Sequence, residues 1–260
     1  MSPVTSSTAT SMHIGSGGIQ VEPWGTERPL FIACVVVSIV AWGALAVSLV
    51  GLLYGALFGL FFFVMHAVFV AHIRGNGVRL SPEQFPELHE RVQRLARRMG
   101  LEPLPDVYLM QAGGALNAFA TKFLGSSLVV LYSDLLEACG ENRAAADMII
   151  GHELGHIRAG HFRWRWLIFP ALMVPFLGKA LSRAREYTCD RWGLAGAGDR
   201  ESALLGLTIL AAGGALAPAV NRRAFARQRA DMTGWWMSVG QWLSTHPPLA
   251  HRLAAIDPTL

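Results

Sequence analysis

The longest hydrophobic stretch of the chain runs from Leu30 to Ile73 and contains no Asp, Glu, Lys or Arg. A helix that crosses a bilayer needs about 20 consecutive apolar residues. The stretch therefore predicts two membrane spans, at residues 30–50 and 53–73, joined by a tight turn near Gly51. A hairpin buried inside a soluble protein is the alternative, but core elements rarely stay uncharged over such a length.

The segments on either side of this stretch differ in character. Residues 1–28 are rich in Ser, Thr and Gly and lack a basic start, so we expect a flexible tail and not a signal peptide. Residues 29–74 form the predicted transmembrane hairpin, and residues 75–260 have the mixed pattern of one folded domain.

Within that domain the pattern predicts first a helix and then strands. Ser81 and Pro82 are typical of a helix start, and apolar residues then recur at helical spacing. This apolar stripe consists of Phe85, Leu88, Val92, Leu95 and Met99. Residues 106–110, 117–123 and 127–131 have the composition of short strands. The domain is therefore expected to be α+β, mostly helical, with a short antiparallel sheet.

Two later apolar segments leave their location open. Residues 162–179 combine alternating Arg and Trp with two prolines, which favours a segment on the membrane surface over one buried in the core. Residues 204–220 are interrupted by Gly213, Gly214 and Pro218. We expect a packed helix there, with a third membrane span as the alternative.

Charge and cysteine content indicate the surroundings. The net charge of +4 comes almost wholly from Arg, and basic residues follow the second predicted span. By the positive-inside rule, the domain and both termini lie in the cytoplasm of a multi-pass membrane protein. The chain has no Arg/aromatic motif for nucleic acid, so the expected partner of its positive charge is anionic membrane lipid. Its three cysteines show no paired spacing, which argues against disulfides.

The strongest chemical signal is His152-Glu153-Leu154-Gly155-His156. The two histidines are four positions apart, so on a helix both imidazoles lie on one face and can bind one metal ion. Glu153 can take a proton from a metal-bound water, whose pKa zinc lowers toward about 7. Asn142 and the apolar residues after it predict this helix. The motif indicates a hydrolase with one Zn²⁺ per chain.

A catalytic zinc needs a third protein ligand. The best candidate is Glu186, because Asp190 lies four positions further on the same helical face and can hydrogen-bond a ligand histidine. Cys189 is the chemical rival, since a thiolate also binds zinc, but it points to another face. A surface helix in which arginines pair with these acids is the alternative without a metal. His161 lies half a turn away from His152 on the helix, so we expect a capping or hydrogen-bonding role.

These residues and their order resemble the M48 peptidases, the membrane zinc proteases that include the HtpX heat-shock protease and the CAAX-prenyl proteases. The resemblance extends from about Leu80 to the C-terminus. It rests on four blocks: Asn117-Ala118-Phe119-Ala120, His152 to His156, Glu186 to Asp190, and Thr245-His246-Pro247-Pro248 with the following Arg252.

The resemblance implies a gluzincin-like peptidase domain in which His152, His156 and Glu186 bind zinc. It further implies that Glu153 is the base and that Asp190 orients a ligand. It also implies that residues Asn117 to Ala120 form a strand that binds the substrate, and that His246 lies near the catalytic cleft. There His246 either acts in catalysis or only caps a helix.

The chain departs from the family in two ways. The stretch before Glu186 is too short for two more spans, and the whole chain is too short for the chamber of the CAAX-prenyl proteases. We therefore expect a compact endopeptidase that cleaves membrane-associated or misfolded proteins. A non-catalytic or sensory zinc module is the alternative.

Overall fold

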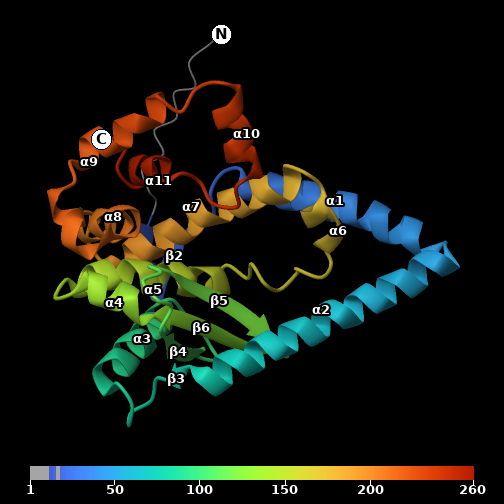
Figure 1. Ribbon diagram of the computed structural model, residues 1–260, viewed down its shortest axis with the longest axis horizontal. Coiled ribbons are helices and arrows are strands. Elements are labelled where there is room, and N and C mark those ends of the chain that lie inside the picture. Colours follow the sequence, from blue (N-terminus) through green and yellow to red (C-terminus); the bar gives the residue numbers. More distant parts are fainter. Residues whose placement is uncertain (1–11, 16–17) are drawn as a thin grey trace.

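The computed structural model describes residues 12–15 and 18–260, so the flexibility predicted for residues 1–11 and 16–17 lies outside the described residues. Two long helices, α1 (Glu27–Ala46) and α2 (Leu49–Asn76), form a hairpin that extends away from a domain of helices and one small sheet (Figure 1). Most of their large apolar side chains are exposed. Among the described residues, α1, α2 and residues 200–219 are long and apolar enough to cross a membrane.

The turn of the hairpin lies at Val47 and Ser48, and not at Gly51 as the sequence suggested. The Ser48 side chain caps α2 by accepting a hydrogen bond from the Gly51 amide at 3.1 Å. Gly51 lies instead in the first turn of α2, where a Cβ would come within 2.8 Å of the Leu45 carbonyl oxygen. A short polar cap, and not a flexible glycine, therefore starts the second helix.

The segment before α1 packs on the domain. Strands β1 (Met12–Gly15) and β2 (Gly18–Val21) pair antiparallel, and the side chain of Ile19 is buried in the main core. The ring of Trp24 stacks on Tyr187 with 4.6 Å between centroids. Residues 18–28 are thus an ordered part of the fold, which corrects the flexible tail predicted there.

The main sheet has the order β3-β4-β6-β5. Its strands are β3 (Val78–Arg79), β4 (Asp106–Met110), β5 (Ala118–Phe123) and β6 (Ser126–Tyr132). The last three strands agree with the sequence prediction to within a residue. The sheet is mixed, however, because β4 and β6 run parallel, so the expectation of a wholly antiparallel sheet was wrong. The β5–β6 hairpin brings β6 back beside β4 in the same direction and leaves β5 at the edge.

Helix α3 (Pro86–Arg98) begins later than predicted. Ser81 and Gln84 form a hydrogen-bonded turn, and Pro86 is the first helical residue. Val92, Leu95 and Met99 are buried as the apolar stripe predicted, whereas Phe85 precedes the helix and stays exposed. Pro at the first helical position has no amide proton to leave unsatisfied, which favours this later start.

Helices α5 (Arg143–Arg158) and α7 (Leu177–Ala197) cross closely in the centre of the domain (Figure 1). A Cβ at Gly155 would come within 2.8 Å of the Trp192 side chain, and a Cβ at Gly193 within 2.5 Å of the Met148 carbonyl oxygen. Both glycines therefore permit an approach that larger residues would block. The two helices that carry the predicted metal ligands are held together by this contact.

The remaining elements surround this pair. α4 (Ser133–Cys139) and α8 (Arg200–Leu216) pack beside α5, and α6 (Phe169–Met173) lies against α1. α9 (Arg222–Arg227), α10 (Trp235–Leu243) and α11 (Leu249–Ile256) complete the chain, with short 3₁₀ turns at Ala217–Ala219 and Gln228–Ala230.

The two apolar segments left open by the sequence have mixed surroundings. In residues 162–179, Ile168 and Ala171 are buried against α1, while Trp164 and Trp166 are exposed. In α8, one face is buried against α5 and α11, and the backbone is kinked at Gly213. The packed helix expected for residues 204–220 is therefore present, although its length and composition also suit a membrane span.

Candidate metal centre

The centre is built on α5, which begins where the sequence predicted. The Asn142 side chain accepts a hydrogen bond from the Ala145 amide at 2.8 Å and so caps the helix. One turn separates His152 from His156, and their Nε2 atoms face α7. Each Nε2 lies 3.4 Å from a different carboxylate oxygen of Glu186. The three predicted ligands are thus brought together around one point.

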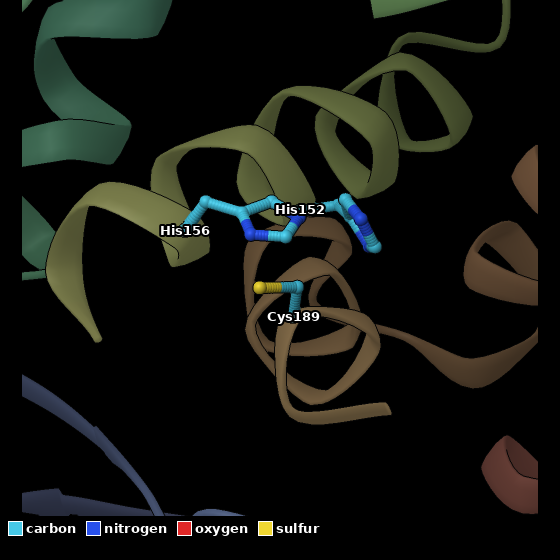
Figure 2. Close-up of side chains that lie close together, drawn as sticks. All are labelled: His152, His156 and Cys189. Atoms are coloured by element: carbon cyan, nitrogen blue, oxygen red, sulfur yellow. The ribbon is translucent and has the colours of Figure 1, made fainter. Parts of the chain in front are cut away.

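Cys189 lies close to the same histidines. One ligand atom from each of His152, His156 and Cys189 lies within 4.8 Å of the others, and Figure 2 shows the thiol of α7 beneath the two rings of α5. Burial raises the pKa of the Cys189 thiol well above its usual value, and the surrounding carboxylates raise it further. Both effects disfavour the thiolate, which is the form of cysteine that binds zinc. The carboxylate of Glu186, which faces both Nε2 atoms, is therefore the better third ligand.

The donor set of two imidazoles and one carboxylate suits zinc. Burial alone would raise the pKa of Glu186, but His152 and His156 outweigh it and hold this pKa well below its usual range. Oε2 of Glu186 is buried and makes no hydrogen bond among the described residues, although His152 Nε2 lies at 3.4 Å and Arg252 Nη1 at 3.6 Å. A charged, buried oxygen without a hydrogen bond is costly in a folded protein. A cation between Glu186 and the two imidazoles would remove that cost.

Asp190 and Arg252 lie behind His152. Nδ1 of His152 is 2.9 Å from Oδ1 of Asp190, which leaves Nε2 facing Glu186. Burial lowers the pKa of His152, but the contacts with Asp190 and Glu186 prevail and raise it to about 10. The guanidinium of Arg252 donates to Asp190, and both side chains are buried beside the ligand helix.

His161 lies behind His156, beyond the end of α5. Nδ1 of His161 is 3.0 Å from Nδ1 of His156, and its Nε2 is 3.0 Å from Oε1 of Glu27 in α1. Burial lowers the pKa of His161 to about 4, so its imidazole is neutral at pH 7. Glu27 is the site residue that sequence reasoning missed. An acidic residue beside Arg28, at the very start of a long apolar helix, was the only signal for it.

A cleft of about 210 Å³ opens over these ligands. Glu153 lies in its wall beside His152 and His156, and its side chain is largely buried. The lining of the cleft also contains all four residues of the predicted substrate strand, from Asn117 to Ala120. His246 lines the rim with its side chain 65% exposed and its Nε2 3.7 Å from Oε1 of Glu186.

A family model for peptidase family M48 matches residues 82–173 and 166–260, which together cover more than half of the chain. The chain belongs to peptidase family M48. Membership implies a metal ion and indicates a membrane metallopeptidase. The mostly helical fold with a small mixed sheet agrees with this assignment.

Three known proteins are similar to this chain. The chain is 27% identical over 208 residues to a plastoglobule-localized metallopeptidase 48 of Arabidopsis thaliana, covering 70% of this chain and 59% of that protein. It is 28% identical over 215 residues to a protease HtpX homolog of Verminephrobacter eiseniae, covering 65% of this chain and 69% of that protein. A crystal structure of S. mikatae Ste24p is similar with a TM-score of 0.49 and 15% identity, covering 90% of this chain and 63% of that one. The chain thus spans less than two thirds of the first relative.

Proposed function

We propose that this M48 family member is a membrane-anchored zinc endopeptidase, with His152, His156 and Glu186 as the ligands of one zinc ion. The observation that carries the proposal is the position of Glu186. Each of its oxygens lies 3.4 Å from the Nε2 of one histidine, on the floor of an open cleft. Three ligands on one side of an accessible cleft are typical of a catalytic zinc site, whereas structural sites are closed.

Zinc held by these residues would supply Lewis-acid chemistry, which acidifies a coordinated water and polarises a carbonyl group. The protein's own part is proton transfer and positioning. Glu153 lines the cleft next to both histidines, so its carboxylate is placed to accept the proton of the attacking water and pass it to the leaving amine. Asp190, held by Arg252, keeps His152 in the tautomer whose Nε2 faces Glu186.

The substrate is proposed to be an extended peptide bound along β5. This strand lies at the edge of the sheet, and the residues from Asn117 to Ala120 line the same cleft as Glu153. An edge strand offers unpaired backbone groups to an added strand. Because helices and compact domains cannot pair in this way, membrane-associated or misfolded proteins with unfolded segments are the substrates that the site favours.

Membrane lipid is the proposed partner of the exposed aromatic residues. The rings of Phe176 and Trp242 contact at 5.8 Å between centroids, which joins α10 to the segment after α6. Trp42 of α1 donates a hydrogen bond from Nε1 to the Leu167 carbonyl at 2.9 Å. An aromatic surface beside a long apolar helix suits the membrane interface. Together with the basic residues after α2, this supports a multi-pass protein of the cell membrane with a cytoplasmic domain.

Detergent-purified full-length protein, assayed on unfolded proteins, tests the function. Glu153→Gln should keep its zinc and lose hydrolysis by roughly 10²–10⁴-fold, because only proton transfer is removed. Glu186→Ala should lose zinc as well as activity. Equal zinc content in the wild type and the Glu186 variant would refute the ligand assignment. Zinc binding by a wild-type protein that hydrolyses nothing would favour the non-catalytic or sensory module.

A further inference from the structure

The Nδ1 atoms of the two proposed metal-ligand histidines contact different partners. His152 contacts the carboxylate of Asp190 directly at 2.9 Å. His156 has no such direct contact among the described side chains; its Nδ1 meets Nδ1 of His161 at 3.0 Å, and His161 in turn meets Glu27 at 3.0 Å. A carboxylate therefore lies behind each ligand, but the second one acts through an intervening imidazole and comes from α1.

The direction of the hydrogen bonds follows from the chemistry of the groups. Nε2 of His156 faces Glu186 and must be free of a proton to bind metal, so its Nδ1 carries the proton and donates it to His161. Nδ1 of His161 is then an acceptor, and its Nε2 carries a proton. That proton points to the Glu27 carboxylate, which is an acceptor only. Each donor in the series His156, His161 and Glu27 meets an acceptor, which leaves one consistent tautomer for each ring.

Glu27 is itself fixed to the ligand helix α7. The Thr188 hydroxyl donates to Oε2 of Glu27 and accepts a hydrogen bond from the Trp24 amide at 2.8 Å. Arg191 lies over the Trp24 ring at 4.8 Å and donates to the Glu22 carbonyl at 2.9 Å. The start of α1 and the residues just before it are thereby anchored to Thr188 and Arg191 of α7, which lie two and five residues after Glu186. The Glu27 carboxylate has little freedom to leave His161.

We propose that Glu27 and His161 are positioning residues, which form a hydrogen-bonded relay that sets the tautomer and ring orientation of His156. The proposal rests on the assignment of His156 as a zinc ligand. It makes the metal centre dependent on the first apolar helix, because the terminal carboxylate of the relay is in the first turn of α1. Partners behind a metal-bound histidine typically change metal affinity by about 10–100-fold.

The test is zinc affinity, measured by chelator competition on the full-length protein in detergent. His161→Phe fills the same space without either nitrogen, and we expect its affinity to fall by about 10–100-fold. His161→Gln should restore most of the loss, because one amide can accept from His156 and donate to Glu27 as the imidazole does. If His161 acted only by packing, the zinc affinities of these two variants would not differ in this way.

A double-mutant cycle shows whether the two residues act together. Glu27→Gln keeps the shape of the side chain and removes its charge, so it should weaken zinc binding in the wild type and have no further effect in the His161→Phe background. Glu90→Gln, an exposed acid on α3, is the control and should change nothing. Unchanged affinity in Glu27→Gln, or additive losses in the double variant, would overturn the relay.

Two controls keep the result interpretable. The melting temperature of each metal-free variant shows whether the fold is intact, and Glu27→Gln and His161→Gln preserve size if His161→Phe does not fold. Since the measurement is zinc affinity and not hydrolysis, it remains decisive if the wild type binds zinc but cleaves no substrate. That result would refute the proposed peptidase activity and leave the relay supported or overturned on its own terms.

Discussion

Arg252 donates to both carboxylate oxygens of Asp190, from Nε to Oδ2 at 2.8 Å and from Nη2 to Oδ1 at 2.5 Å. The two side chains are almost wholly buried, with exposures of 8% and 2%. Oδ1 of Asp190 contacts both the guanidinium and Nδ1 of His152. The ion pair thus connects the last helix, α11, to the ligand helices α5 and α7.

Arg252→Met should be strongly destabilising. The substitution removes the guanidinium from a buried ion pair, which typically costs roughly 3–5 kcal/mol. Chemical denaturation of the detergent-solubilised protein measures this loss. Arg94→Met is the matched control, because its pair with Glu90 is exposed and contributes little. A similar loss in both variants would show that burial of the Asp190 pair is unimportant.

Zinc affinity should increase with pH. In the metal-free protein the pKa of His152 is raised to about 10, so this ring is charged at neutral pH and must lose a proton to bind zinc. Below that pKa the apparent affinity should rise about tenfold per pH unit for the one proton released. The stability of the metal-free fold changes with pH in the opposite direction. The charged ring stabilises the metal-free protein fully below its unfolded pKa of about 6.5, and this contribution is lost as the pH rises toward 10.

Calorimetric titrations with zinc, in buffers of different ionisation enthalpy, count the protons released. The count should be at least one per zinc ion between about pH 6 and pH 8. An affinity that stays constant over this range, with no proton release, would contradict a charged His152 in the metal-free state.

Gly193→Ala should separate α5 from α7. The added Cβ would come within 2.5 Å of the Met148 carbonyl oxygen, so one helix has to shift, at a cost of roughly 1–3 kcal/mol. Zinc affinity should fall with stability, because the ligands are on both helices. Gly240→Ala in α10 is the control: nothing lies within 4 Å of its added Cβ, and alanine favours a helix. Equal stability of the two variants would disprove the close-packing role of Gly193.

His246→Ala should reduce kcat by roughly 10²-fold while zinc content and folding stay intact. The side chain is 65% exposed at the rim and makes little packing contact, yet its Nε2 is 3.7 Å from Glu186. Steady-state kinetics with a zinc assay make the measurement. An increase in kcat would instead identify His246 as a self-inhibiting ligand, and an unchanged kcat would leave it a structural residue.

The orientation of the hairpin can be tested at its turn. A tag inserted between Val47 and Ser48 should be accessible from outside the cell, whereas reporters after Arg79 and at the C-terminus should be cytoplasmic. A C-terminal reporter found outside would make residues 200–219 a third span.

The parts of the fold that the sequence predicted well are those specified by local pattern. Asn142 capped its helix as expected, and the strands at 106–110 and 118–123 appeared almost to the residue. The parallel pairing of β4 with β6 was not predictable in the same way, because it depends on which strands meet and not on either strand's own residues.

The site shows the same division. The i,i+4 spacing of His152 with His156, and of Glu186 with Asp190, follows from helical periodicity, so each pair could be placed on one helix face from the sequence. Glu27 is 134 residues from His161 in sequence, and no periodicity connects them. The true partner of Arg252 was hidden for the same reason, since Asp190 is 62 residues away on another helix.

The position of β5 at the edge of the sheet has a consequence for which bonds can be cut. A peptide added to this edge must be fully extended, so successive side chains point alternately toward the cleft and away from it. Only every second residue of the substrate would then be read by the protein. The substrate sequence preference, when it is mapped with peptide libraries, should therefore alternate along the peptide. Every second position should be selective, and the positions between them should accept any residue.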